Sequence, residues 1–266
     1  MYDSFNRTIN YLRISVTDRC NLRCTYCMPE EGIPLLQSKS ILSFEELAEF
    51  AKIAVSHGIT KIRITGGEPL VRKDIVRLIE MISQIPGIED LSMTTNGILL
   101  EKYAVQLKNA GLMRVNISLD ALNPDRFRKI TRIGDLQDVL RGIKAAQSAG
   151  LNPIKLNCVI KKSRLEPDAV SVAKYAFENQ LSVRFIREMD LQNGIFYEVE
   201  GGEGGKCNTC NRLRLTASGD LKPCLFSSSA YNIRELGNEK ALQEAIKNKP
   251  ACGSLNHNGK FYSIGG

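Results

Sequence analysis

The sequence predicts an α/β fold, namely a partial, TIM-like (β/α)6 barrel with a small C-terminal appendage. Six strand patterns of alternating apolar and polar residues are separated by helical patterns over the first two-thirds of the chain, and the segments have the lengths of barrel units. Strand–helix units that follow one another give parallel strands with helical crossovers. The polar residues of interest lie on one face of a strand or just past its end, where such barrels carry their chemistry.

The strand patterns have a period of two. In the first of them, Leu12 and Ile14 alternate with Arg13 and Ser15. One face of this strand is expected to lie under helices, so Arg13 on the other face is expected to point inward. The expected strands cover residues 12–17, 61–65, 90–95, 114–119, 154–160 and 182–186.

The segments between the strands carry apolar residues at helical spacing. The first helix is expected to begin at Ser43, with Glu46 completing a capping box, and to end at Gly58. Asp74 is expected to cap the second helix. Further helices are expected to end near Ala110 and to cover 135–147 and 167–179. Residues 120–132 are interpreted as a polar loop.

The C-terminal part departs from the strand–helix alternation. Residues 193–206 include the run GGEGG and are interpreted as a Gly-rich, flexible linker. Segments 212–216 and 221–224 are predicted to form a hairpin across Ser218-Gly219, and a short helix is expected at 239–248. The predicted units are a partial barrel at 1–192, the linker at 193–206 and a C-terminal segment at 207–266.

Composition indicates a globular protein, because 43% of the 266 residues are hydrophobic and 24% are charged. The sequence has no run of about 18 apolar residues and no apolar stretch typical of a signal peptide, so a cytoplasmic protein without a membrane partner is expected. The net charge of +7 is spread along the chain, and aromatic residues are few. We therefore expect a phosphate-bearing small molecule rather than a nucleic acid as the partner.

Cys20, Cys24 and Cys27 form a CxxxCxxC motif within the segment RISVTDRCNLRCTYC, just after the first expected strand. Three thiolates are one ligand short of a closed tetrahedral zinc site, and iron–sulfur cubes normally take four cysteines. A three-cysteine loop therefore leaves one iron open to an outside ligand, as S-adenosylmethionine (SAM) would require. A zinc knuckle and a redox cysteine group are the alternatives.

The form of this motif, with Tyr26 before the last cysteine, resembles that of the radical SAM superfamily. Gly66-Gly67-Glu68-Pro69 follows the next strand, where that superfamily carries a GGEP segment for the SAM amino group. The resemblance implies a [4Fe–4S] cluster that binds SAM and cleaves it to a 5′-deoxyadenosyl radical.

A second group consists of Cys207, Cys210 and Cys224, in the pattern CxxC, thirteen residues, then C. Two interpretations remain open for it. A structural zinc ion would need a fourth ligand, which Cys252 or His257 could supply, whereas a second three-cysteine [4Fe–4S] cluster would keep an open iron. Outside the two groups, Cys158 and Cys252 are expected to be small buried apolar residues.

The segment CNTCNRLRLTASGDLKPCLF, residues 207–226, resembles the C-terminal cluster segment of the GTP 3′,8-cyclase (MoaA) family. Residues 12–29 and the Gly265-Gly266 tail match that family as well. The resemblance implies SAM and two [4Fe–4S] clusters as cofactors. It implies a lyase that converts GTP to (8S)-3′,8-cyclo-7,8-dihydroguanosine 5′-triphosphate, the first step of molybdenum cofactor biosynthesis, with the radical abstracting the ribose 3′ hydrogen.

The resemblance also implies roles for individual residues. The six cysteines of the two groups would ligate the clusters. SAM contacts are implied for Tyr26, Gly67, Ser118 and Met189, and GTP contacts for Arg13, Arg63, Thr94, Lys155, Arg212 and Arg214. No side chain is assigned as a catalytic acid or base, because the radical chemistry takes place at the clusters. Arginines suit a triphosphate because they grip phosphate oxygens bidentately.

The implied partners are the small molecule GTP, a reducing electron donor and a downstream pterin synthase. A homodimer is considered, and the oligomeric state is left open. The chain lacks a segment that the family carries between Met189 and Cys207, and Arg187 stands where the family usually has Glu.

Two other functions are weighed: a radical SAM enzyme for another substrate such as a peptide, and a zinc-ribbon module that binds nucleic acid. The zinc-ribbon hypothesis leaves the GGEP segment and the six strand–helix units unexplained.

Overall fold

The computed structural model describes residues 1–189 and 197–253. Its strands, in chain order, are β1 (Tyr11–Ser15), β2 (Lys61–Thr65), β3 (Asp90–Thr95), β4 (Arg114–Ser118), β5 (Lys155–Ile160), β6 (Ser182–Arg187), β7 (Arg212–Leu215), β8 (Asp220–Lys222) and β9 (Tyr231–Asn232). They belong to one sheet with the order β6-β5-β4-β3-β2-β1-β7-β8-β9.

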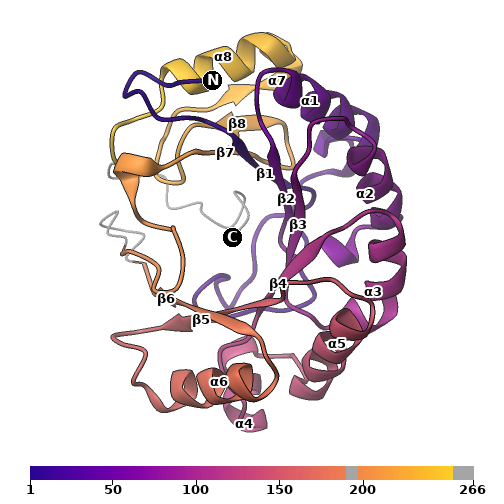
Figure 1. Ribbon diagram of the computed structural model, residues 1–266, viewed down its shortest axis with the longest axis vertical. Coiled ribbons are helices and arrows are strands. Elements are labelled where there is room, and N and C mark those ends of the chain that lie inside the picture. The colour runs from indigo at the N-terminus through magenta and orange to yellow at the C-terminus, as the bar shows by residue number, and fades with distance from the viewer. Residues whose placement is uncertain (190–196, 254–266) are drawn as a thin grey trace.

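All neighbouring pairs from β6 to β1 are parallel, as strand–helix units require. The sheet curves around a central axis without closing, and its concave face is turned inward (Figure 1). This arrangement confirms the predicted partial (β/α)6 barrel. The carboxyl ends of six consecutive strands therefore meet along one rim.

The helices are α1 (Phe44–Ser56), α2 (Ile75–Ser83), α3 (Leu100–Asn109), α4 (Pro124–Thr131), α5 (Leu136–Ser148), α6 (Pro167–Glu178), α7 (Ile233–Leu236) and α8 (Asn238–Lys247). Figure 1 shows α1, α2, α3 and α5 along the convex side of the sheet. Alternate strand residues such as Leu12, Ile62 and Leu156 are fully buried beneath them. Their neighbours along each strand must consequently face the concave side. Among the described helices, none combines the length and the apolar character that a membrane crossing requires.

The two predicted N-caps, Ser43 of α1 and Asp74 of α2, differ in whether the side chain caps the helix. At α1 the capping box is confirmed, because the Ser43 hydroxyl accepts from the Glu46 N–H at 3.1 Å and the Glu46 carboxylate accepts from the Ser43 N–H at 2.7 Å. At α2 the side chain of Asp74 makes no capping hydrogen bond, although the residue stands at the N-cap position. Its backbone there is left-handed, with φ of 58°.

The prediction of a polar loop at 120–132 is wrong, because α4 occupies most of it. The Asn123 side chain accepts a hydrogen bond from a first-turn N–H at 3.0 Å, and Pro124 at the first helical position has its φ preset for a helix. Phe127 is buried and anchors the helix. These start signals were present in the sequence, but the high polarity of the segment concealed them.

The C-terminal part is continuous with the barrel sheet. Strand β7 pairs in parallel with β1, which places Arg214 opposite Arg13. The predicted hairpin is confirmed by the antiparallel pairing of β7 with β8, and α8 matches the predicted short helix. The sheet itself marks no boundary here, so the division into units at 192 and 207 stays a prediction.

The described part of the Gly-rich segment, 197–206, is folded against β6 rather than free. Phe185 and Glu200 exchange backbone hydrogen bonds of 3.0 and 3.1 Å. Gly205 has φ of +87°, and a Cβ added to it would lie 2.4 Å from the Tyr197 carbonyl oxygen. Glycine is therefore needed here for a tight turn, and the described part of the predicted linker is held against β6.

Candidate active site

The first three cysteines lie in the loop that leaves the carboxyl end of β1. The Cys24 carbonyl accepts from the N–H groups of Cys27 and Met28 at 3.0 and 2.9 Å, which forms a tight turn. Burial raises the pKa of Cys20 to about 11 and that of Cys24 to about 12, and the neighbouring thiols contribute in each case. The three sulfurs thus lie within electrostatic range of one another, while Cys27 remains exposed to an incoming ligand.

The GGEP segment holds this loop through the backbone. Gly67 and Glu68 donate their N–H groups to the carbonyls of Thr17 and Arg19 at 2.7 and 2.8 Å. The Glu68 carboxylate is buried and accepts from the Thr95 hydroxyl at 2.8 Å. A Cβ on Gly67 would lie 2.4 Å from the Arg19 carbonyl oxygen. The absence of a side chain is therefore required for close approach of the two loops.

Replacement of Gly67 by Ala should displace the cysteine loop, because the added methyl group would meet backbone atoms that have no rotamer by which to move aside. We expect 5′-deoxyadenosine formation from SAM to fall by about 100-fold, the usual effect of a small misplacement in an active site. Gly237→Ala is the control for backbone strain without a clash at the loop, since its Cβ would meet nothing within 4 Å and its φ of +79° strains an alanine. Equal activities of the two variants would contradict this role for Gly67.

Tyr26 ties the cysteine loop to the ends of two further strands. Its hydroxyl donates to the Asp120 carboxylate at 2.7 Å, and that carboxylate also accepts from the Val159 N–H at 2.7 Å. Burial raises the pKa of Asp120 to about 6. Ser118 and Met189, at or just past the ends of β4 and β6, lie half-buried at the same rim. Asp120 was missed by sequence reasoning, although its place just past a strand end was a usable signal.

Cationic side chains from six strands face the concave side of the sheet. These seven side chains are Arg13 (β1), Arg63 (β2), Arg114 (β4), Lys155 (β5), Arg184 (β6), and Arg212 and Arg214 (β7). Burial lowers the pKa of Arg13 to about 9, with Arg214 adding to the effect, and it lowers the pKa of Arg63 to about 9. Burial also lowers the pKa of Lys155, with Arg184 contributing. These shifts measure how unfavourable it is to crowd buried positive charges together.

Arg13, Arg63, Lys155, Arg184 and Arg212 form no ion pair with a carboxylate among the described residues. Arg114 does form one, since it donates to Asp90 at 2.8 Å. The Nε atoms of Arg13 and Arg184 and the Thr94 hydroxyl are buried without a hydrogen-bond partner in the described chain. Buried polar groups are nearly always satisfied, so these atoms indicate a polar, anionic ligand on the concave face.

Two residues of this face were missed by sequence reasoning. Arg184 belongs to β6, and the alternation of that strand would have placed it inward with Ser182. Tyr11 begins β1, and its ring lies 5.4 Å from the Arg63 guanidinium and 5.8 Å from that of Arg212. The ring thereby helps to hold two like charges near each other.

The second cysteine group lies beside β7 and β8, at the end of the sheet opposite the carboxyl ends of the parallel strands. Cys207 and Cys210 bound the short 3-10 turn before β7, and Cys224 follows β8. Burial raises the pKa of Cys207 to about 11, and the thiols of Cys252 and Cys224 add to this shift. Cys252 is exposed beside the group, so its predicted burial is wrong, whereas the predicted burial of Cys158 is confirmed.

Among the described residues, no three cysteine, histidine or acidic side chains are grouped as a bound metal ion would require. The first group offers three thiols, the number that leaves one iron of a [4Fe–4S] cube open. His257 and the Gly265-Gly266 tail lie outside the described residues.

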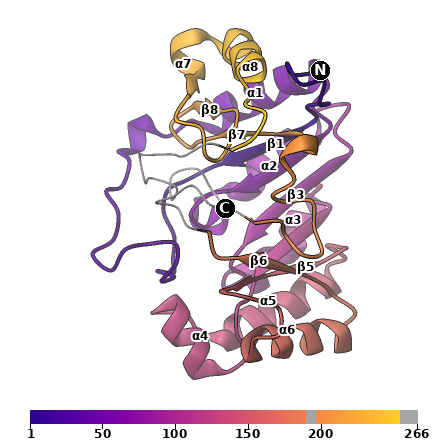
Figure 2. The same cartoon turned by 90° about the vertical axis from the view of Figure 1, so that its left-hand side faces the viewer.

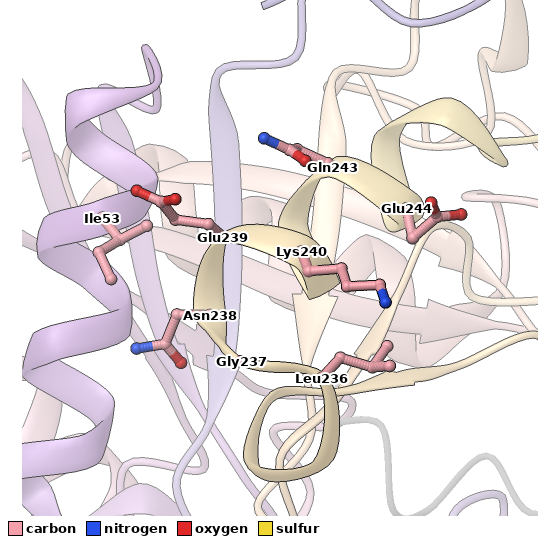
Figure 3. Close-up of a pocket in the computed structure, with 8 residues that line it drawn as sticks. All are labelled: Ile53, Leu236, Gly237, Asn238, Glu239, Lys240, Gln243 and Glu244. Carbon is pink, nitrogen blue, oxygen red and sulfur yellow. The ribbon is translucent and has the colours of Figure 1, made fainter.

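A separate surface pocket lies between α1 and the corner that joins α7 to α8 (Figure 3). Ile53, Leu236, Lys240 and Glu244 are among its lining residues. None of the predicted site residues contributes to it, and it lies on the outer side of the molecule. The concave face of the sheet is therefore the better candidate for the site.

Two family models match the chain. The radical SAM superfamily matches residues 14–174, and Molybdenum Cofactor Synthesis C matches residues 203–253. Among solved structures, Streptococcus suis SuiB bound to precursor peptide SuiA has a TM-score of 0.68 at 17% identity, covering 94% of this chain and 67% of SuiB. The structure of anSMEcpe with bound AdoMet has a TM-score of 0.62 at 16% identity, covering 96% and 80%. Fold and cysteine loop thus define a radical SAM enzyme, which uses SAM and a [4Fe–4S] cluster.

Curated relatives identify the family. The GTP 3′,8-cyclase of Thermodesulfovibrio yellowstonii is 43% identical, covering 93% of this chain and 91% of the relative, and that of Petrotoga mobilis is 41% identical, covering 94% and 91%. The chain belongs to the GTP 3′,8-cyclase family of molybdenum cofactor biosynthesis enzymes. The first alignment has 293 positions, and 93% of 266 residues is about 247, so about 46 positions of it have no counterpart here. The relative thus carries about 46 aligned positions more than this chain.

Proposed function

We propose that this chain converts GTP to (8S)-3′,8-cyclo-7,8-dihydroguanosine 5′-triphosphate, as the first step of molybdenum cofactor biosynthesis. The observation that carries the proposal is the buried positive charge on the concave face, between the two cysteine groups, where the Nε atoms of Arg13 and Arg184 lack a hydrogen-bond partner in the described chain. A triphosphate supplies the negative charge that these side chains lack. The 41–43% identical relatives, which are GTP 3′,8-cyclases, support the same substrate.

The proposed role of the concave face is to bind and orient the nucleotide. Arg13 and Arg184 have buried Nε atoms ready to donate, and Thr94 offers a hydroxyl. Arg212 already donates to the Glu203 carbonyl at 3.1 Å, which restricts its guanidinium. We assign Arg63, Lys155 and Arg214 to the same group of GTP contacts. Cations on separate strands can hold all three phosphates at once, because the sheet brings them to one surface.

The proposed SAM site is the rim beside the first cysteine group. When bound there, the cluster and SAM supply a 5′-deoxyadenosyl radical for abstraction of the ribose 3′ hydrogen. Gly67 lets the cysteine loop approach the GGEP segment closely, and Tyr26 fixes that loop through Asp120. Ser118 and Met189 complete the proposed set of SAM contacts from the ends of their strands. This placement would hold the reacting groups near the nucleotide and away from bulk water.

We assign a second [4Fe–4S] cluster to Cys207, Cys210 and Cys224, which would hold three of its irons and leave the fourth to bind the guanine. Support comes from the Molybdenum Cofactor Synthesis C match, which includes these cysteines. The parallel pairing of β7 with β1 brings this group next to the inward cations. The shortened segment before Cys207 reduces the side wall of the nucleotide site. We infer that residues 197–206, docked on β6, form what remains of that wall.

The remaining proposals concern the surroundings of the enzyme. All eight cysteines are free thiols, and free thiols and iron–sulfur clusters belong to a reducing compartment, so we propose a cytoplasmic location. A low-potential electron donor and a downstream pterin synthase are the proposed partners, and a homodimer is a further hypothesis. A peptide substrate is less favoured, because the likeness to SuiB and anSMEcpe is one of fold alone.

The test is an anaerobic assay of the reconstituted protein with SAM, dithionite and GTP labelled with deuterium at C3′. We expect a cyclised guanosine triphosphate, and deuterium in the 5′-deoxyadenosine, both measured by mass spectrometry. ATP is the matched control and should give neither. Unlabelled 5′-deoxyadenosine with GTP unchanged would overturn the proposed substrate while leaving the radical SAM class intact.

A further inference from the structure

One buried ammonium group connects the parts of the second cysteine group. Lys249 follows α8, and its side chain is almost fully buried. Its Nζ donates to the Arg212 carbonyl at 2.7 Å, to the Pro223 carbonyl at 2.7 Å and to the Cys210 Sγ at 3.5 Å. Pro223 directly precedes Cys224, so all three donors of a single ammonium act on the two chain segments that carry Cys210 and Cys224.

A second buried cation, the Arg7 guanidinium, binds backbone carbonyls of and near the same cysteine group. Arg7 donates to the Cys207 carbonyl at 2.7 Å and to the carbonyls of Pro250 and Ala251 at 2.7 and 2.9 Å. The N-terminal segment that carries Arg7 runs beside α8 in both views (Figures 1 and 2). Arg7 is neutralised by Asp3, whose carboxylate accepts from it at 2.6 Å. The Lys249 backbone is thus fixed beside the cysteines.

Lys249 differs from Arg7 in its charge balance. It forms no ion pair with a described carboxylate, and the Cys210 sulfur lies 3.5 Å from its Nζ. A buried ammonium without an opposite charge is strongly unfavourable. Thiolates on a bound cluster would supply that charge at the correct place.

We propose that Lys249 is the counter-cation of the second cluster, a positioning residue that holds Cys210 and Cys224 and eases reduction of the cluster. The inference rests on the second cluster assigned under the proposed function. Hydrogen bonds to cysteine sulfur and nearby positive charge favour the reduced, more negative state of an iron–sulfur cluster. Loss of the ammonium should therefore make the midpoint potential of this cluster more negative and weaken its retention.

The test compares Lys249→Met with Lys247→Met in a Cys24→Ala background, where the remaining iron belongs to the second group. Lys247 ends α8 and is exposed, so it controls for a lost lysine. Iron and sulfide content, loss of iron to a chelator, and an EPR-monitored redox titration are measured. We expect a more negative midpoint and faster iron loss for Lys249→Met, with values for Lys247→Met equal to those of the parent.

Lys249→Gln separates charge from packing, because its amide can still donate two of the three hydrogen bonds. We expect it to retain iron better than Lys249→Met and still to show the more negative midpoint. Folding of Lys249→Met is checked in a chain that keeps Cys24, where a misfolded variant would lose SAM cleavage. If Lys249→Met does not fold, Lys249→Gln provides the test instead. A cluster with unchanged midpoint and retention in both variants would overturn the inference alone. Absence of iron from the Cys24→Ala parent would overturn it together with the proposed second cluster.

Discussion

Cys24→Ala is expected to abolish SAM cleavage, lowering the yield of 5′-deoxyadenosine by at least about 100-fold, because a cluster held by two cysteines would not be retained. The bound iron should fall from about eight to about four atoms per chain, since the second group is untouched. The tight turn at Cys24 is closed by hydrogen bonds to the backbone carbonyl of this residue. Alanine keeps that carbonyl, so the fold should survive the substitution. Anaerobic product analysis and iron determination provide the measurements.

The matched control for Cys24→Ala is Cys158→Ala. Cys158 is fully buried in β5, and its Sγ contacts only backbone carbonyls, at 3.9 Å, among the hydrogen-bond partners described. Its replacement should cost about 1 kcal/mol of unfolding free energy through a small cavity and leave SAM cleavage intact. If both cysteine variants lost activity equally, the effect would be one of stability and not of cluster ligation.

Arg184→Met is expected to weaken GTP binding by about 10- to 100-fold, the usual effect of losing a hydrogen bond to a charged group. The same substitution should raise the thermal midpoint of the substrate-free chain. The Nε of Arg184 is buried without a partner, and its neighbours Arg114 and Arg212 are also positive, so a methionine of similar length relieves an unfavourable charge. Weaker binding combined with higher stability is typical of a functional residue, whereas a structural residue would lose stability.

Arg187→Met is the control on the same strand. Arg187 lies on the opposite face of β6, where its guanidinium lies 3.8 Å from the centre of the Tyr197 ring. We expect its replacement to leave GTP affinity within about twofold, since surface changes away from a site have small effects. Calorimetric titration with GTP and thermal unfolding would measure both variants. Equal affinity losses in the two would contradict the assignment of the concave face as the nucleotide site.

The crowding of positive charge on the concave face also predicts that the stability of the substrate-free enzyme depends on bound anions. Arg13 and Arg63 are buried close together, and their lowered pKa values reflect the unfavourable free energy of keeping them charged there. A bound triphosphate converts this repulsion into attraction. The stability that the chain gives up in the absence of ligand is thereby recovered as binding free energy.

Local sequence patterns were sufficient for the strands and most helices. Period-two alternation located β1 to β6, and the Ser43 capping box located the start of α1. The CxxxCxxC and CxxC motifs identified both cysteine groups, because short spacings along the chain enforce proximity in space. The wrong prediction of a loop at α4 had a local cause as well. Asn123 and Pro124 are helix start signals, but the polar composition of the segment favoured a loop.

Long-range pairing could not be predicted from such patterns. Nothing local to residues 212–215 indicates that β7 joins β1 in parallel, yet this pairing sets Arg214 opposite Arg13. The contact between Tyr26 and Asp120 joins positions 94 residues apart, and the Lys249 ammonium reaches back 39 residues to Cys210. Such contacts depend on how the whole chain packs.

By itself, the sequence determined the class of fold, the two cysteine groups and the chemistry that they support, because each depends on residues that are near neighbours along the chain. Only the tertiary structure decided which cations share one face, which of them lack a partner and where the second cysteine group lies. The physical reason is that burial and charge pairing are properties of the folded surface. Arg184 and Lys249 resemble ordinary surface residues in the sequence, and both are given their roles by the groups that the fold brings to them.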